Sequence, residues 1–312
     1  MTARPLHFEL GEELSPDGRF LRQESAFRRW VTADGSSGFP AVAGRYHLYA
    51  APACPWSQRS VIVRLLKGLE EAIGVSYLHP YRDARGWAFM GGEFVDDVNG
   101  FEFLSEAYLT TDPDFDDRVT VPVLWDKETG KIVSNESGEI MRMLGTEFED
   151  YAEPGVDLFP EPLRPEIDSL NLLMYENLND AVYVAGFSTS QEAYAEAFER
   201  VFATLDHLEE RLASSRYLVA DRPTEPDWRL FPTLVRFDSV YYSHFKCNRR
   251  RIVDYPNLWG YTRDLYQLPG IAETVAMDQI KRHYYTTHDM LNPSQIIPAG
   301  PELDFLAPHG RG

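Results

Sequence analysis

The stretch AAPACPWSQRSVIVRLLKG, residues 50–68, decides the first half of the fold. Cys54 stands directly before Pro55, and apolar residues then recur at helical spacing as far as Leu69. Proline suits the first position of a helix because it has no N–H to leave unpaired there. The pattern therefore predicts a helix that begins at Pro55, with Cys54 at its N-terminal cap.

This position of Cys54 favours a reactive thiol. A helix N-terminus carries roughly half a positive charge and several unpaired N–H donors, which stabilise a thiolate. Ser57 stands three residues further on, so the CPWS motif cannot close the internal disulfide of a Cys-x-x-Cys pair. The partner sulfur then comes from elsewhere, most naturally from a small-molecule thiol. In the alternative reading Cys54 is a small buried hydrophobe, and that is what we expect of Cys247 in CNRRR.

The residues around this stretch indicate an α/β domain. Tyr46, Leu48 and Ala50 alternate with His47, Tyr49 and Ala51, which predicts a short strand, and VSYLHPY (75–81) predicts a second one. Residues 83–117 show no clear periodicity and predict an irregular insertion. Residues 118–144 indicate a strand, a turn at 128–130, another strand and a helix. This order is that of a thioredoxin-like domain, which we expect over residues 45–146, after an N-terminal extension over residues 1–44.

The second half of the chain carries a helical pattern. Residues 147–165 are rich in proline and acidic residues and indicate a linker. An amphipathic stripe runs over residues 198–212, and Thr224 and Asp227 fit a capping box. We therefore expect residues 166–312 to form an all-helical domain with a C-terminal tail.

Composition and charge exclude several classes of function. The chain has 312 residues, and 30 Lys and Arg against 49 Asp and Glu give a net charge of −19. Such a surface repels phosphates and anionic lipids, so we expect no nucleic-acid or membrane partner. Two cysteines and no secretory pattern indicate a cytoplasmic protein. His283 and His288 do not share a helical face and lack further ligands, so we expect no metal site.

Three further residues are candidates for binding a thiol peptide. In a thioredoxin-like fold, the proline of Val121-Pro122 is typically cis and faces the cysteine, and the Val121 backbone would pair with an extended peptide. Glu136 and Ser137 lie at the start of the next helix, where they would receive an ammonium and a carboxylate. In the alternative reading, Ser134 and Ser137 only cap that helix.

Several motifs together resemble the glutathionyl-hydroquinone reductases, the Xi class of glutathione transferases. They are CPWS, VTVPVLWDKETGKIVSNESGEIMRML, NLNDAVYVAGF, HFKCNRRRIVDYPNLWGYTRDLYQLPG and HYYTTHDMLNPSQIIPAGP. The resemblance covers nearly the whole chain, although Ser57 stands where the family usually has alanine and brings a hydroxyl near the sulfur. It implies an α/β thioredoxin-like domain followed by an all-helical glutathione-transferase domain that binds substrate and forms a homodimer. It also implies a reaction in which a glutathionyl-hydroquinone and glutathione yield hydroquinone and glutathione disulfide.

The resemblance also implies roles for particular residues. Cys54 is the catalytic nucleophile, which forms a mixed disulfide with glutathione or with another low-molecular-weight thiol. The positions expected to bind glutathione are Trp87, Arg118, Val121, Glu136 and Ser137. The positions expected to contact the hydroquinone are Tyr183 and Tyr284, with Tyr241, Tyr242 and Tyr285 as further candidates. Each of these has a plainer reading, as a packing aromatic or a solvated charge.

Two other functions stay open at this point. One is a glutathione transferase or omega-like thiol transferase that acts on other electrophiles or disulfides. A transferase that conjugates electrophiles normally uses a Ser or Tyr to activate bound glutathione, so Cys54 favours disulfide chemistry instead. The other is a non-enzymatic binding module, because a fold by itself does not imply an activity. The intact CPWS motif argues against it.

Overall fold

The structure is a computed structural model that describes residues 13–311. The described chain forms two compact units, and each is discontinuous in sequence. The first unit combines residues 24–157 with residues 276–287, and the remaining described residues form the second unit. The domain boundaries that we drew from the sequence, at residues 44, 146 and 165, stay predictions.

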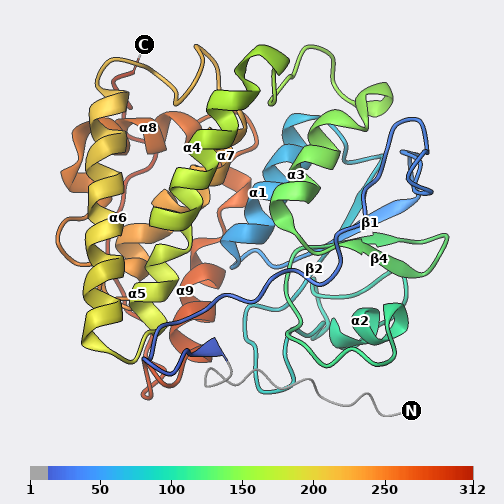
Figure 1. Ribbon diagram of the computed structural model, residues 1–312, viewed down its shortest axis with the longest axis horizontal. Coiled ribbons are helices and arrows are strands. Elements are labelled where there is room, and N and C mark those ends of the chain that lie inside the picture. The colour runs from blue at the N-terminus through green and yellow to red at the C-terminus, as the bar shows by residue number, and fades with distance from the viewer. Residues whose placement is uncertain (1–12, 312) are drawn as a thin grey trace. The chain divides into compact units, whose positions relative to one another are not determined.

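A four-stranded mixed sheet forms the centre of the first unit (Figure 1). Its strands are β1 (Tyr46–Ala50), β2 (Gly74–Tyr77), β3 (Val123–Asp126) and β4 (Lys131–Ser134), in the spatial order β2-β1-β3-β4. β1 is parallel to β2 and antiparallel to β3, and β3 pairs with β4 as a hairpin. Every residue of β1 is buried, as expected of a central strand. The predicted thioredoxin-like order of elements is thus confirmed.

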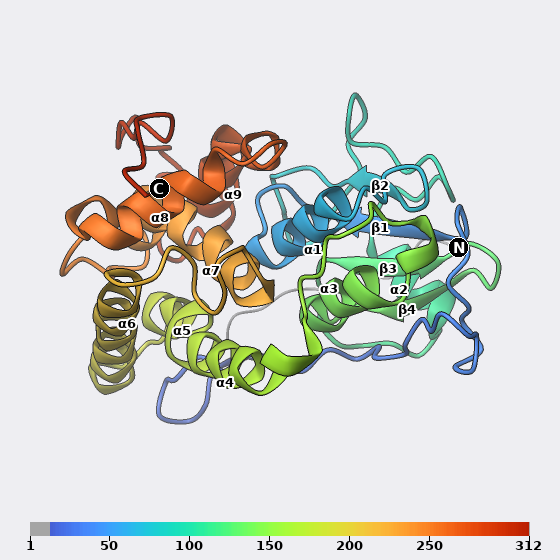
Figure 2. The ribbon, with the colours of Figure 1, turned by 90° about the horizontal axis from the view of Figure 1, so that it is seen from above.

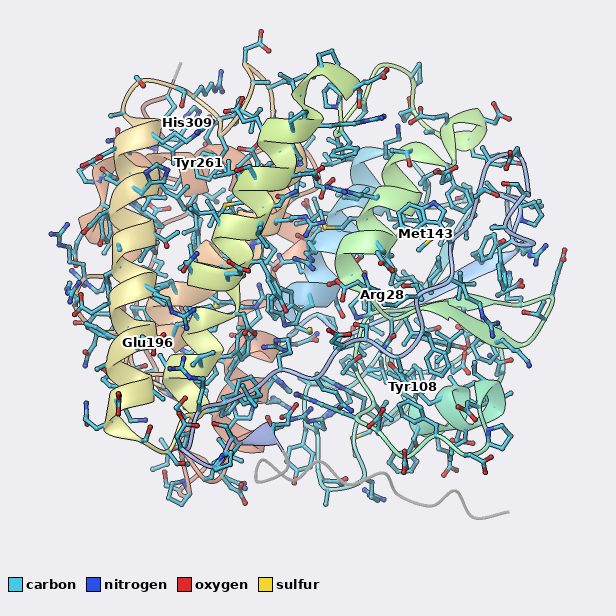
Figure 3. All side chains as sticks on the ribbon, in the orientation of Figure 1. Arg28, Tyr108, Met143, Glu196, Tyr261 and His309 are labelled. Carbon is cyan, nitrogen blue, oxygen red and sulfur yellow. The ribbon has the colours of Figure 1, made fainter. Side chains whose placement is uncertain are left out.

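The helices of the first unit are α1 (Pro55–Leu66), α2 (Ser105–Thr111), α3 (Ser137–Thr146) and α9 (Met277–Thr287). α1 and α3 pack against each other (Figures 1 and 2). The expectation of an irregular insertion was wrong at α2. This helix has only seven residues, too few to show a helical period, and it forms because Tyr108 is buried and Thr111 accepts a hydrogen bond from the β4 backbone. Tyr108 is labelled in Figure 3.

The second unit is helical. It contains α4 (Arg164–Met174), α5 (Ala181–Phe187), α6 (Gln191–Leu212), α7 (Glu225–Arg236), α8 (Pro256–Tyr266) and two π-helical turns, η4 (Tyr175–Asn179) and η5 (Phe237–Tyr241). Four short 3₁₀ segments complete the described elements: η2 (Glu149–Tyr151) in the first unit, and η3 (Glu161–Leu163), η6 (Ile252–Asp254) and η7 (Ala272–Thr274) in the second.

Two sequence signals in this unit are confirmed. The stripe over residues 198–212 becomes the buried face of α6, which packs against α5 and α8. The capping box at the start of α7 is present, and the Thr224 N–H donates to Asp227 at 2.7 Å. Among the described helices, none has the length and apolar character needed to cross a membrane.

Candidate active site

Cys54 is the N-cap of α1, as predicted, and Pro55 occupies the first helical turn. The Cys54 backbone is extended, with φ −85° and ψ 125°. The Cys54 carbonyl accepts the first helical hydrogen bond, from the Gln58 N–H at 3.0 Å. The thiol does not cap the helix itself. Only 8% of the residue is exposed. The sulfur therefore lies at the positive end of α1, within the reach of the helix field.

The Val121-Pro122 peptide bond is cis, as the sequence predicts. The Cys54 thiol points its hydrogen toward the Val121 carbonyl, with Sγ and O 3.8 Å apart. Val121, Cys54 and Trp87 belong to one buried apolar cluster. The strand end that we expected to bind an extended peptide is thus next to the cysteine.

Ser57 does not use its hydroxyl on the sulfur. The residue is fully buried, and its Oγ accepts a hydrogen bond from the Ala51 N–H at 3.2 Å. The Ala51 carbonyl in turn accepts from the Cys54 N–H at 2.9 Å. Ser57 therefore holds the turn that presents Cys54 at the start of α1.

Glu136 is the N-cap of α3, and its carboxylate accepts from the Gly138 N–H at 3.0 Å. The second carboxylate oxygen accepts from the Ser25 hydroxyl at 2.9 Å. Ser134 contributes differently, because its Oγ accepts from the Glu136 N–H at 3.1 Å. The cap is thus supplied by Glu136 and not by a serine, and Ser137 begins the helix.

Arg59 is a residue of this site that our sequence reasoning missed. It lies on α1, and its guanidinium donates to Ser137 Oγ from Nη2 at 2.6 Å and from Nε at 3.2 Å. Nη2 also lies 3.7 Å from the Glu136 carboxylate, and the guanidinium stacks 4.7 Å from the Trp56 ring. Its side chain is only 3% exposed. The sequence signal that could have revealed Arg59 is its position among the residues of α1 that are buried, because a buried charge requires partners.

Trp87 packs in a closed environment. It is 5% exposed, and its ring stacks on His283 of α9 with centroids 4.9 Å apart and planes at 16°. His283 is fixed by a 2.8 Å hydrogen bond between Nδ1 and the Pro80 carbonyl. The Arg82 guanidinium lies 5.4 Å from the indole centroid. His283 is thus a buried histidine that contacts both the Trp87 ring and a backbone carbonyl.

Arg118 is a half-buried loop residue before β3. It is close to Tyr108: burial raises the pKa of that phenol, and the Arg118 charge opposes the rise. Arg118 is therefore a nearby cation in the same unit as Cys54, but its position does not identify a ligand.

The candidate tyrosines fall into two groups. Tyr183 on α5 is 8% exposed, and its hydroxyl lies 3.4 Å from that of the fully buried Tyr241. Tyr284 and Tyr285 are buried on α9, in the unit that holds Cys54. Tyr242 follows Tyr241 and is half-buried. The pairing of Tyr183 with Tyr241 could not be seen in the sequence.

Cys247 is completely buried, and its Sγ lies 3.8 Å from the Phe245 carbonyl. Burial raises the pKa of its thiol to about 12. A thiol in this state is a poor nucleophile near neutral pH, which supports the structural role that we expected for it.

A thioredoxin-like sheet with a cysteine at a helix N-terminus beside a cis-proline, followed by a helical unit, is the architecture of a glutathione transferase. Two family models match the chain accordingly. "Glutathione S-transferase, N-terminal domain" matches residues 53–147, and "Glutathione S-transferase, C-terminal domain" matches residues 191–264.

Individual relatives define the class more closely. The chain is 50% identical over 306 residues to glutathionyl-hydroquinone reductase YqjG of Escherichia coli (strain K12), covering 95% of this chain and 93% of that protein. The glutathione-bound structure of YqjG superposes with a TM-score of 0.89 at 51% identity, covering 92% and 96% of the two chains. A Xi-class transferase from Natrialba magadii gives 0.90 at 50% identity, covering 95% of each. The chain therefore belongs to the glutathionyl-hydroquinone reductases, the Xi class of glutathione transferases.

Proposed function

We propose that the protein is a glutathione-dependent reductase that removes glutathione from glutathionyl-hydroquinones. The products are hydroquinone and glutathione disulfide. One observation carries the proposal: a single cysteine, Cys54, stands at the N-cap of α1, 3.8 Å from the Val121 carbonyl, with Ser57 and not a second thiol in its motif. The activity for which YqjG is named and the glutathione bound in its structure support it.

In the first step the Cys54 thiolate attacks the sulfur of the glutathionyl group. A disulfide bond forms between Cys54 and glutathione, and the bond between sulfur and the ring carbon breaks. The electron pair of that bond goes to the ring carbon, which takes up a proton and leaves as hydroquinone. The ring is thereby reduced by two electrons, and the two sulfurs are oxidised. The field at the start of α1 favours the thiolate that this step needs.

In the second step a free glutathione thiolate attacks the glutathione sulfur of the mixed disulfide. Glutathione disulfide leaves, and the Cys54 thiolate is restored. Ser57 cannot compete, because it has no sulfur and because its hydroxyl binds the Ala51 backbone. Buried Cys247 takes no part.

The start of α3 suits the charged end of the γ-glutamyl group. N–H groups at a helix N-terminus attract a carboxylate, the Ser137 hydroxyl adds a donor, and the Glu136 carboxylate attracts an ammonium. Arg59 fixes the Ser137 side chain through its two hydrogen bonds. The Val121 backbone would pair with the extended peptide, as an added strand does. Arg118 is a candidate for its glycyl carboxylate, and Trp87 for a flat wall against the peptide. A Tyr hydroxyl, from Tyr183 or Tyr284, would donate the proton that the ring carbon requires.

The test is to incubate the protein with glutathionyl-menadiol and glutathione and to measure the rate at which hydroquinone is released. We expect activity in the wild type and in Cys247→Ala, and none above background in Cys54→Ala. Reductase activity retained in Cys54→Ala contradicts the mechanism. Conjugation of a chloroaromatic without reductase activity favours a transferase, and absence of both favours a binding module. Mass spectrometry of the adduct on Cys54 after exposure to a cell extract identifies the native thiol.

We also propose that the protein works as a cytoplasmic homodimer. The family resemblance implies the homodimer, and two free cysteines, Cys54 and Cys247, suit a reducing compartment such as the cytoplasm. Light scattering coupled to size-exclusion chromatography tests the dimer, which requires twice the mass of one chain. A single-chain mass at micromolar concentration rules it out.

A further inference from the structure

The N-terminal segment from residue 13 to residue 23 belongs to the helical unit. Its backbone is fixed to the end of α5 by two hydrogen bonds. The Phe20 N–H donates to Ser188 Oγ at 3.1 Å, and the Thr189 N–H donates to the Gly18 carbonyl at 2.8 Å. Arg22 follows this fixed part of the segment and lies beside the start of α5.

Arg22 reaches two residues of that helix start. Its Nε donates to the Asp180 carboxylate in an ion pair, and its guanidinium carbon lies 4.8 Å from the centre of the Tyr183 ring. The Arg22 and Asp180 side chains are 21% and 18% exposed. Asp180 is itself tied to Tyr183, because its carbonyl accepts from the Tyr183 N–H at 2.8 Å. Asp180 therefore binds both the Arg22 guanidinium, through its carboxylate, and the Tyr183 backbone, through its carbonyl.

A cation over an aromatic ring is attracted to the ring face, and the attraction grows where water is excluded. The same cation stabilises negative charge that develops on the phenol oxygen. Burial opposes the charge of Arg22, but the neighbouring Asp180 and Tyr183 raise its pKa above the ordinary value of arginine. Arg22 therefore stays a cation at every working pH.

We propose that Arg22 is a positioning residue for Tyr183, through which the N-terminal segment takes part in the reaction. The inference rests on the proposed function. Arg22 orients the phenol and makes its hydroxyl a stronger proton donor. Tyr183 gives its proton to the ring carbon that has lost sulfur, the cation stabilises the resulting phenolate, and the phenolate regains a proton from water.

The experiment compares steady-state kinetics with glutathionyl-menadiol in four proteins: wild type, Arg22→Gln, Tyr183→Phe and the double variant. We expect Arg22→Gln to lower kcat about tenfold, part of the effect of a general acid, and to change the KM for glutathione less than about twofold. Arg22→Lys, which keeps the cation, should recover most of kcat. In the Tyr183→Phe background, Arg22→Gln should cause no further loss, because its effect acts through the phenol.

A matched control comes from the same segment. Arg19 pairs with Glu196, labelled in Figure 3, on the exposed surface of α6 and lies over no candidate tyrosine ring in the described structure. Arg19→Gln should keep the wild-type kcat. If Arg22→Gln does not fold, Asp180→Asn, which weakens the anchor, must show the same loss of kcat.

Two results overturn the inference while leaving the proposed function intact. One is a wild-type kcat in Arg22→Gln. The other is an equal loss on replacing Arg22 in the presence and absence of the Tyr183 hydroxyl, which would indicate a merely structural role. A wild-type enzyme without reductase activity, or a Cys54→Ala variant that retains it, refutes the proposed function itself, and the inference falls with it.

Discussion

Replacing Arg59 by methionine tests whether the contact between α1 and α3 shapes the proposed glutathione site at the start of α3. The guanidinium is 3% exposed and donates twice to the Ser137 hydroxyl, at 2.6 and 3.2 Å. Methionine keeps most of the length and volume of the side chain, but it has no charge and no donor. The sulfur can still pack on the Trp56 ring, so the loss is mainly polar.

The expected cost follows from these contacts. Hydrogen bonds that involve a charged group contribute about 1.5–3 kcal/mol, and two donors that share one hydroxyl count for less than twice that value. Removing the guanidinium also removes its desolvation cost. We therefore expect a loss of about 3 kcal/mol in the free energy of unfolding, or ~5 °C in Tm for a chain of 312 residues. Ser137, freed to rotate, should lose about one hydrogen bond to glutathione, which raises the KM for glutathione about tenfold.

Thermal unfolding followed by circular dichroism measures the first effect, and steady-state kinetics with varied glutathione measures the second. Arg28→Gln is the control, because Arg28 (Figure 3) pairs with Glu139 on the same helix α3 but its side chain is 54% exposed. An exposed pair of this kind contributes about 0–1 kcal/mol. The reasoning is refuted if Arg59→Met keeps the wild-type KM, or if Arg28→Gln raises it equally.

Three further predictions concern stability and reactivity. Burial lowers the pKa of His47 from 6.5 to about 4, so the unfolded chain binds more protons than the folded chain between these two pH values. Acidification from pH 7 to pH 5 should therefore lower the free energy of unfolding by about 2 kcal/mol. Urea unfolding should show this loss in the wild type and less of it in His47→Gln; equal losses would contradict the assignment. Iodoacetamide at pH 8 should leave Cys247 unmodified in the folded protein, since a thiol of pKa about 12 is almost fully protonated there. Mass spectrometry checks this, and a label on that residue without unfolding would count against it. Gly186→Ala should destabilise the protein by about 1–3 kcal/mol, because the new Cβ would lie 2.3 Å from the Phe245 ring. Gly145→Ala is the control, since its new Cβ would meet nothing closer than 3.9 Å. Equal Tm values for the two variants would disprove the clash.

The features that the sequence determined by itself are local. The cap at Cys54, the proline at the first helical turn and the capping box at Thr224 and Asp227 all join residues a few positions apart. The stripe of α6 follows from a residue-by-residue period for the same reason. The family, with its fold and its class of reaction, could be recognised because CPWS and four longer motifs occur in a specific order along nearly the whole chain.

The tertiary structure alone decided which distant residues meet. Arg59 and Ser137 are 78 positions apart, Arg22 and Asp180 are 158, and His283 and Pro80 are 203. No period or spacing in a single sequence connects such pairs, because their contacts arise only when separate elements pack. The short helix α2 was missed for the same reason, since its burial against β4, and not its own pattern, stabilises it. The candidate nucleophile was therefore visible in the sequence, whereas the partners of two arginines, Ser137 for Arg59 and Asp180 for Arg22, were not.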